Sequence, residues 1–187
     1  MNRLRVTALP LGGLCRVDRL VAIDERGSFA RLFCATELAG AGWIGPVAQV
    51  NHSRTLRRGI VRGLHFQRPP HAEMKLVSCV RGAVFDVALD LRRDSPTYGR
   101  WHGEELRAQD GGAMLLPEGL AHGFQALTDD AELVYCHGAA YEPGSEGGLH
   151  ALEGDHGIAW PLAAAALSPR DAALPRFACA TFEARAP

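Results

Sequence analysis

Residues 75–93 read KLVSCVRGAVFDVALDLRR, and this stretch decides the fold class. It holds two short apolar runs, 75–80 and 84–91, with Gly82 in the segment that separates them. Alternate residues of a strand share a face, so 85, 87, 89 and 91 form one apolar face and 84, 86, 88 and 90 form the other. The second face carries Asp86 and Asp90, which suggests a wet cavity, although a plain solvent-facing side is as common an explanation.

Similar runs recur along the chain, separated by 21 Gly and 11 Pro residues. Helical signals are few: residues 36–42 favour one or two turns, and 168–174 another, with Ser168 as N-cap and Pro169 at the first helical position. Short strands at regular spacing with turn residues between them predict an all-β sandwich or barrel with a few short helices. The expected strands are 16–23, 47–50, 75–80, 84–91, 113–116 and 131–135.

The composition is that of an ordinary globular chain, and we expect one domain over residues 1–187, with 178–187 as an exposed tail. Twenty basic residues face twenty-one acidic ones, a net charge of −1, which argues against a nucleic-acid footprint. No apolar run approaches the length of a membrane span, and the first twenty residues do not match the pattern of a signal peptide. We therefore expect a cytoplasmic protein without membrane or nucleic-acid partners.

The five cysteines, at 15, 34, 79, 136 and 179, are widely spaced and form no C-x-x-C motif. An odd count without close pairs argues against a disulfide framework or a cysteine zinc site. Free, buried thiols are expected.

Polar side chains that could carry chemistry concentrate in four patches. Because residues two apart share a strand face, Gln49 with Asn51, and His65 with Gln67, can point into one pocket. The patches are QVNHS (49–53), RGLHFQRPPHAEMK (62–75), PEGLAHGF (117–124) and ELVY (132–135).

A metal site is an alternative explanation of this pattern, because His65, His71, Glu73 and His122 could be ligands in a cupin-type barrel. Such a site usually needs two histidines alternating on one strand, but position 67 is Gln, a weak ligand. His71 follows two prolines and lacks fixed geometry toward His65. The sequence also has no G-x-S-x-G, G-x-G-x-x-G or P-loop motif, which argues against hydrolase, dinucleotide and P-loop chemistry.

A His, a Tyr, a Lys and a carboxylate remain, a set suited to removing a proton beside a carbonyl. An imidazole can take the proton, an ammonium can stabilise the enolate, and a phenol on the other face can return a proton. Lys75 is the only lysine beside nineteen arginines. Structural roles stay open: His65 as a core histidine, Tyr135 as a core aromatic, His122 as a hydrogen-bonding support, and Lys75 as an accident of composition.

The sequence resembles the dTDP-4-dehydrorhamnose 3,5-epimerase family. The resemblance rests on the blocks RGLHFQ (62–67) and PEGLAHGF (117–124) within 61–101 and 115–127, followed by AELVY (131–135). Flanking pieces agree in order over residues 24–177: DERGSFARLF, QVNHS, EGGL, GIAWPL and LSPRD. It implies a jelly-roll, cupin-type β-barrel, a homodimer with the nucleotide site near the subunit junction, and no metal or redox cofactor. The implied substrate is a nucleotide-linked 4-keto-6-deoxy sugar, on dTDP.

The resemblance also implies roles for particular residues. His65 is the base and Asp171 orients it, Tyr135 is the acid, and Lys75 supports the enolate oxygen. The implied substrate contacts are Arg26 and Arg62 for the diphosphate, Gln49, Asn51 and His122 around the sugar, Phe29 and Tyr141 around the nucleobase, and Asp86 as a pocket acid that hydrogen-bonds a histidine.

Three departures from the family pattern bear on specificity. Ser28 and Arg31 stand where many members carry an aromatic residue and Glu, which leaves the nucleotide open. The usual tryptophan-rich stretch is replaced by 150–156, so the register that places Asp171 depends on the LSPRD motif. These changes leave open an enzyme that epimerises C3 or C5 only, on a different nucleotide sugar. A metal-using or non-catalytic sugar-binding cupin is the alternative from another class.

Overall fold

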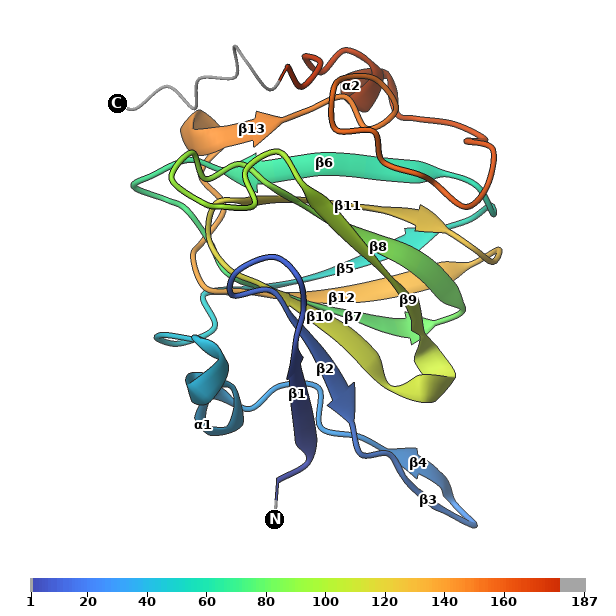
Figure 1. The fold of residues 1–187 in the computed structure, drawn as a ribbon. Coiled ribbons are helices and arrows are strands. Elements are labelled where there is room, and N and C mark those ends of the chain that lie inside the picture. Colours follow the sequence, from blue (N-terminus) through green and yellow to red (C-terminus); the bar gives the residue numbers. More distant parts are fainter. Residues whose placement is uncertain (1, 179–187) are drawn as a thin grey trace.

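Two antiparallel sheets packed face to face dominate the computed structural model, which describes residues 2–178 (Figure 1). The six-stranded sheet has the order β1 (Leu4–Ala8), β2 (Cys15–Arg19), β10 (Gly112–Leu116), β7 (Lys75–Arg81), β12 (Ala131–His137) and β5 (Gln49–Thr55). The five-stranded sheet has the order β13 (Glu146–Gly148), β6 (Val61–Gln67), β11 (Leu120–Ala126), β8 (Ala83–Asp90) and β9 (Trp101–Arg107). The predicted jelly-roll barrel is confirmed.

The remaining elements are short. A hairpin of β3 (Ala22–Asp24) and β4 (Gly27–Phe29) projects from the sheets (Figure 1). Both predicted helices are present, as α1 (Ala35–Leu38) with the 3-10 turn η1 (Ala39–Ala41), and as α2 (Pro169–Ala172). Further 3-10 turns are η2 (Ala108–Asp110) and η3 (Pro143–Ser145). Within residues 2–178, none of the helices is long and apolar enough to cross a membrane.

The predicted strands are found with small corrections. The expected run 16–23 is broken at Leu20 and Val21, so it forms the end of β2 and the start of β3. Of the expected run 47–50, only 49 and 50 are in a strand, β5, and its polar residues continue the pairing with β12 as far as Thr55. The tail from 179 to 187 lies outside the described residues.

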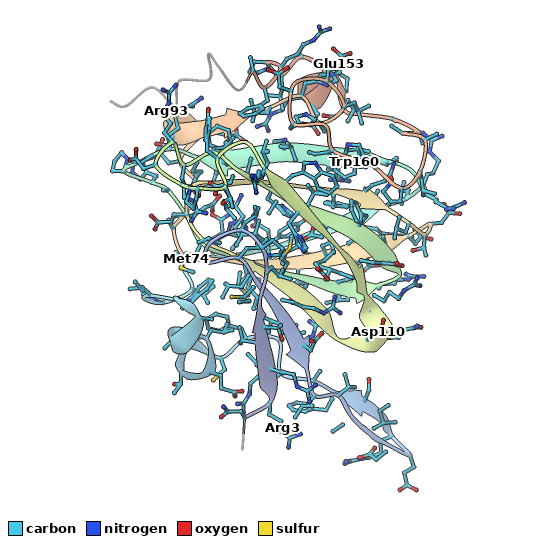
Figure 2. The ribbon with its side chains drawn as sticks, in the orientation of Figure 1. Arg3, Met74, Arg93, Asp110, Glu153 and Trp160 are labelled. Carbon is cyan, nitrogen blue, oxygen red and sulfur yellow. The ribbon has the colours of Figure 1, made fainter. Side chains whose placement is uncertain are left out.

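Three clusters of buried residues hold the layers together. Side chains fill the space between the sheets (Figure 2). There, Val77 and Leu133 from one sheet and Val84 and Phe124 from the other belong to one cluster. On the outer face of the six-stranded sheet, a second cluster includes Leu38 of α1. On the outer face of the five-stranded sheet, the third cluster includes residues of the segment 149–177. Four cysteines, 15, 34, 79 and 136, are free thiols; 15, 79 and 136 are buried as expected, whereas Cys34 is half-buried, and position 179 lies outside the described residues.

Two glycines let β6 and β11 approach closely beside the histidines they carry. A Cβ on Gly63 would lie 2.6 Å from the Cα of Gly123, and Gly63 has φ of +114°, which side chains rarely adopt. A Cβ on Gly123 would lie 2.7 Å from the carbonyl oxygen of Arg62. His65 and His122 face each other in the register next to this contact. The glycines in RGLHFQ and AHGF therefore set the spacing of these strands.

Candidate active site

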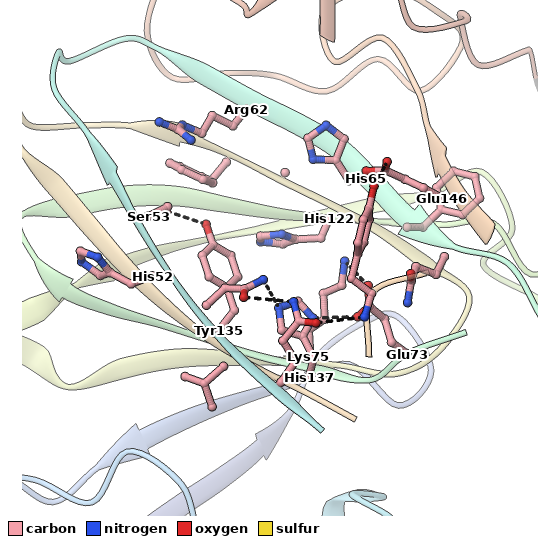
Figure 3. Close-up of a pocket in the computed structure, with 18 residues that line it drawn as sticks. His52, Ser53, Arg62, His65, Glu73, Lys75, His122, Tyr135, His137 and Glu146 are labelled. Carbon is pink, nitrogen blue, oxygen red and sulfur yellow. Dashed lines mark hydrogen bonds and ion pairs between the residues drawn. The ribbon is translucent and has the colours of Figure 1, made fainter. Parts of the chain in front are cut away.

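A cavity of about 530 Å³ opens between the two sheets (Figure 3). Eight of the twelve predicted site residues line it: Gln49, Asn51, Arg62, His65, Lys75, His122, Tyr135 and Tyr141. The other lining residues are Val50, His52, Ser53, Phe66, Gln67, Glu73, Gly123, Phe124, His137 and Glu146. Asp86 and Asp171 stand behind lining histidines, whereas Arg26 and Phe29 are not part of this cavity.

His65 on β6 is held by Asp171 on α2. The imidazole Nε2 lies 2.8 Å from Asp171 Oδ1, and Oδ2 accepts the backbone N–H of Gly63 at 3.3 Å. Ser168 caps the helix by accepting the N–H of Asp171 at 3.0 Å, as the sequence predicts. Because the carboxylate only accepts, Nε2 carries the proton, and Nδ1 is the nitrogen able to take another.

The electrostatics keep Asp171 ionised. Burial alone would raise the pKa of Asp171, but the hydrogen bond from His65, with those from Gly63 and Ser168, outweighs burial and lowers it. The His65 side chain is 35% exposed while that of Asp171 is 5% exposed. The pair therefore presents one partly accessible imidazole, backed by a buried negative charge.

A second buried pair lies next to the first. His122 Nε2 is 2.7 Å from Asp86 Oδ1, and Asp86 is fully buried. Burial raises the pKa of Asp86 although His122 opposes this effect. Val84 and Ala88 on the same strand face belong to the cluster between the sheets, so this face of β8 points inward, but neither Asp86 nor Asp90 lines the cavity and, in the described part of the chain, the expected wet cavity on this face is not found. Asp86 itself meets His122 and not water.

Tyr135 on β12 comes from the six-stranded sheet, opposite the strand that carries His65. Its hydroxyl shares a hydrogen bond of 3.0 Å with Ser53 Oγ. Burial raises the pKa of Tyr135 well above its ordinary value, so the phenol is protonated at neutral pH. Its ring meets His122 edge-on at 6.0 Å and stacks on His137 at 6.1 Å, centroid to centroid.

Lys75 is buried at the start of β7 and is 8% exposed. Its Nζ lies 2.9 Å from Glu73 Oε1, and Glu73 Oε2 lies 2.7 Å from His137 Nδ1. Burial would raise the pKa of Glu73, but His137 and Lys75 outweigh it and hold the pKa below its ordinary value. The ammonium thus belongs to the cavity wall and not to a solvated surface.

The amides of Gln49 and Asn51 continue this network. Asn51 Nδ2 lies 3.3 Å from His137 Nε2, and Gln49 Nε2 donates to Asn51 Oδ1 at 3.0 Å. Gln49 Oε1 in turn accepts the backbone N–H of Tyr141 at 3.0 Å. As predicted for alternate residues, the two side chains act on one face of β5.

Aromatic and charged groups ring the mouth of the cavity. The Tyr141 hydroxyl donates to Glu146 at 2.8 Å, and Arg170 forms an ion pair with the same carboxylate. Arg62 is exposed and donates to the carbonyl oxygen of Arg54 at 3.0 Å. A cationic guanidinium at this edge can meet an anionic group that extends from the cavity.

Arg26 and Phe29 lie on the projecting β3–β4 hairpin. Arg26 pairs with Asp24 at 2.6 Å, and Phe29 is 70% exposed. Arg31, the departure noted in the sequence, pairs with Glu37 of the same chain. Within one chain, the structure does not bring these residues to the cavity.

Gln67 lines the cavity beside His65, as strand alternation predicts, and five further polar lining residues were not among the predicted site residues: His52, Ser53, Glu73, His137 and Glu146. Ser53 follows Asn51 by two positions and His137 follows Tyr135 by two, so strand alternation could have identified both. The sequence offers Glu73 only as a candidate metal ligand. Within residues 2–178, no three or more His, Cys, Asp or Glu side chains group so that they could hold a metal ion.

The comparisons with known proteins agree with this geometry. The sequence model of the dTDP-4-dehydrorhamnose 3,5-epimerase family matches residues 8–178. A dTDP-4-dehydrorhamnose 3,5-epimerase of Streptomyces griseus is 49% identical, over 74% of this chain and 68% of that protein. A dTDP-4-dehydrorhamnose 3-epimerase of Streptomyces niveus is 41% identical, over 90% of this chain and 81% of that protein.

A solved structure agrees as well. The 3,5-epimerase of Legionella pneumophila, crystallised with dTDP-4-keto-L-rhamnose, superposes with a TM-score of 0.88 at 35% identity, covering 97% of this chain and 95% of that one. The motifs that carry the resemblance supply the walls of the cavity, with RGLHFQ on β6, PEGLAHGF leading into β11 and AELVY on β12. The chain therefore belongs to the dTDP-4-dehydrorhamnose 3,5-epimerase family and is an isomerase, an epimerase of carbohydrates.

Proposed function

We propose that the protein inverts C3, C5 or both in a nucleotide-linked 4-keto-6-deoxyhexose carried on dTDP. One observation carries the proposal: His65 and Tyr135 reach the same cavity from opposing sheets. Inversion needs a proton removed from one face of a carbon and returned to the other. An imidazole and a protonated phenol on opposite walls supply these two functions.

The reaction proceeds through an enolate. His65 Nδ1 takes the proton next to the C4 ketone, and the C–H electron pair moves into the carbonyl, which becomes an enolate oxygen. The Lys75 ammonium stabilises that oxygen, and Asp171 stabilises the imidazolium that forms. Tyr135 gives its hydroxyl proton to the opposite face of the carbon. Exchange with solvent then returns a proton to Tyr135 and removes one from His65.

We further propose that the protein works as a homodimer in which the β3–β4 hairpin serves the partner's cavity. Phe29 and Ile23 are 70% and 80% exposed on this hairpin, which is unusual for apolar side chains of this size. Docking on a second copy would bury them and bring Arg26 to the diphosphate. Sedimentation equilibrium of the protein and of Ile23→Asp tests this arrangement, because a monomeric wild-type protein would contradict it.

The reaction is tested by incubation with dTDP-4-keto-6-deoxyglucose in deuterated water, followed by mass spectrometry. Incorporation of two deuterons indicates exchange at C3 and C5, and one indicates a mono-epimerase. No incorporation would reject this substrate. The mono-epimerase alternative is supported by the 41% identity to a 3-epimerase. A tightly held stoichiometric metal in the purified protein would favour the metal-using cupin.

A further inference from the structure

Glu73 and His137 form a buried pair that the proposed reaction does not use. The side chains of both are almost enclosed, with 7% and 10% exposed. Glu73 contacts Lys75 with one oxygen and His137 with the other, so one carboxylate joins the ammonium to the imidazole (Figure 3). A buried carboxylate is costly unless both oxygens are satisfied, and here both are.

The hydrogen-bond chain that ends on His137 fixes its protonation. The backbone N–H of Tyr141 can only donate, so the Gln49 atom 3.0 Å away is the carbonyl oxygen. The Gln49 amide nitrogen then donates to Asn51 Oδ1, and this turns the amide nitrogen of Asn51 toward His137 Nε2. Nε2 faces a donor and must accept. The single proton of a neutral His137 therefore sits on Nδ1.

This tautomer suits Glu73. The Nδ1–H of His137 donates to Oε2 at 2.7 Å, and the ammonium of Lys75 donates to Oε1 at 2.9 Å. The carboxylate thus receives one neutral and one cationic donor, and it remains ionised because these donors lower its pKa. A lysine ammonium has three N–H groups, so a single ion pair leaves two that can turn to a substrate oxygen.

We propose that Glu73 and His137 are positioning residues for Lys75, with Glu73 holding the ammonium in the cavity wall and His137, as the Nδ1–H tautomer, holding Glu73. The inference rests on the proposed function of Lys75 as the group that stabilises the enolate. Lysine reaches its target through a flexible four-carbon stem. A fixed anion beside Nζ limits the positions that the charge can occupy, so less reorganisation is needed when the enolate forms.

A double-mutant cycle tests this inference. Glu73→Gln keeps the size of the side chain but removes its charge and sets an N–H₂ against either Lys75 or the Nδ1–H of His137. We expect kcat to fall about tenfold with little change in KM, since the loss is bounded by the about 10²–10³-fold expected for one electrostatic donor. In a Lys75→Met background, Glu73→Gln should cause no further loss. Interacting sites give such non-additivity, whereas independent sites give additive effects.

The matched control is Glu132→Gln. Glu132 on β12 also pairs with a histidine, His52, at 3.1 Å, but Glu132 does not line the cavity. Its kcat should stay close to that of the wild-type protein. Circular dichroism and thermal melts establish that each variant is folded before its rates are compared.

The outcomes separate the two proposals. If Lys75→Met retains full activity, the proposed function of Lys75 is wrong. If Lys75→Met is impaired and Glu73→Gln lowers kcat equally in both backgrounds, only the positioning role is wrong. A Glu73→Gln variant with unchanged or higher kcat also overturns that role.

A measurement on the wild-type protein covers the case in which Glu73→Gln does not fold. Long-range ¹H–¹⁵N correlation spectra of protein labelled at the histidine ring nitrogens distinguish the two neutral tautomers. The spectrum of His137→Gln assigns the signals of His137 by their disappearance. We expect the Nδ1–H form at neutral pH. An Nε2–H form would break the chain of donors and refute the inference.

Discussion

Asp171→Asn tests whether the pairing with His65 makes the imidazole a base. In the wild-type protein, the two carboxylate oxygens accept from His65 Nε2 at 2.8 Å and from the N–H of Gly63 at 3.3 Å. Asparagine replaces one of these acceptors with an N–H₂ donor. Either the amide nitrogen faces Gly63, which leaves two donors opposed, or it donates to His65 Nε2 and moves the imidazole proton to Nδ1.

Both orientations weaken the base, and the geometry gives the size of the effect. The first replaces the charge-assisted hydrogen bond to the imidazolium, worth about 1.5–3 kcal/mol, with a neutral one, worth about 0.5–1.5 kcal/mol, so the rate should fall by about tenfold. The second places a proton on the nitrogen that should accept one, which removes general-base catalysis, worth about 10²–10⁴-fold. We therefore expect deuterium exchange into the 4-keto sugar to slow by about 10-fold in the first orientation and by about 10²–10⁴-fold in the second.

The assay is a mass-spectrometric time course of exchange in deuterated water, because exchange reports proton removal independently of the product formed. Ser168→Ala is the control, since it removes the oxygen that caps α2 but leaves the carboxylate of Asp171 in place. It should lower the free energy of unfolding by about 1 kcal/mol while exchange continues at a near wild-type rate. A folded Asp171→Asn variant that exchanges as fast as this control would refute the reasoning.

Three further predictions follow from the other buried groups. Tyr135→Phe should retain exchange by His65 while net epimerisation fails, and a variant that forms normal product would return Tyr135 to a core role. Lys75→Met should lower kcat by about 10²–10³-fold, more than it raises KM. Lys75→Arg should not restore the rate, because a planar guanidinium does not place its charge where a compact ammonium does; near wild-type kinetics would contradict this. Burial would raise the pKa of Asp90, but Arg92, Ser95 and Thr97 outweigh it and lower the pKa from 3.8 to about 2. Since this folded-state pKa is depressed, Asp90 stabilises the protein above about pH 4 and loses this effect as pH falls toward 2. In urea titrations at pH 7, Asp90→Asn should lower the free energy of unfolding by about 2 kcal/mol relative to the wild-type protein, and this difference should narrow as the pH falls. A difference that stays constant with pH would contradict the assignment.

The barrel could be predicted from the strands with a clear hydrophobic pattern. The strands that carry the cavity histidines were harder to predict. The residues of β8 fall on two alternating faces, and nearly every side chain on both faces is buried, so the strand reads as a long apolar run. In β6, VRGLHFQ, and β11, LAHGFQA, glycines and cavity-facing histidines replace apolar residues, so neither strand shows a plain hydrophobic alternation. There the need for polar side chains and close backbone contact obscures the signal.

Site residues near one another in sequence could be grouped by alternation, but those brought together by the fold could not. Gln49 and Asn51 needed only the period of a strand. The contact between His65 and Asp171 joins residues 106 positions apart, and it was placed by resemblance to a family and not by spacing. The link from Glu73 to His137 also crosses the chain, over 64 positions. No local pattern encodes such a pair, because each partner is a common residue at an ordinary strand position.

The distance along the chain between His65 and Asp171 has a consequence for synthesis. Every strand of both sheets ends by Gly148, so the barrel has all its strands before the ribosome reaches α2. The imidazole gains its partner only when Ser168 and Asp171 emerge and the segment after β13 docks on β6, where Leu64 and Leu149 exchange two backbone hydrogen bonds of 2.9 Å. A chain that stops before α2 would lack the carboxylate that orients His65, so the base depends on a segment that is made after every strand of the barrel.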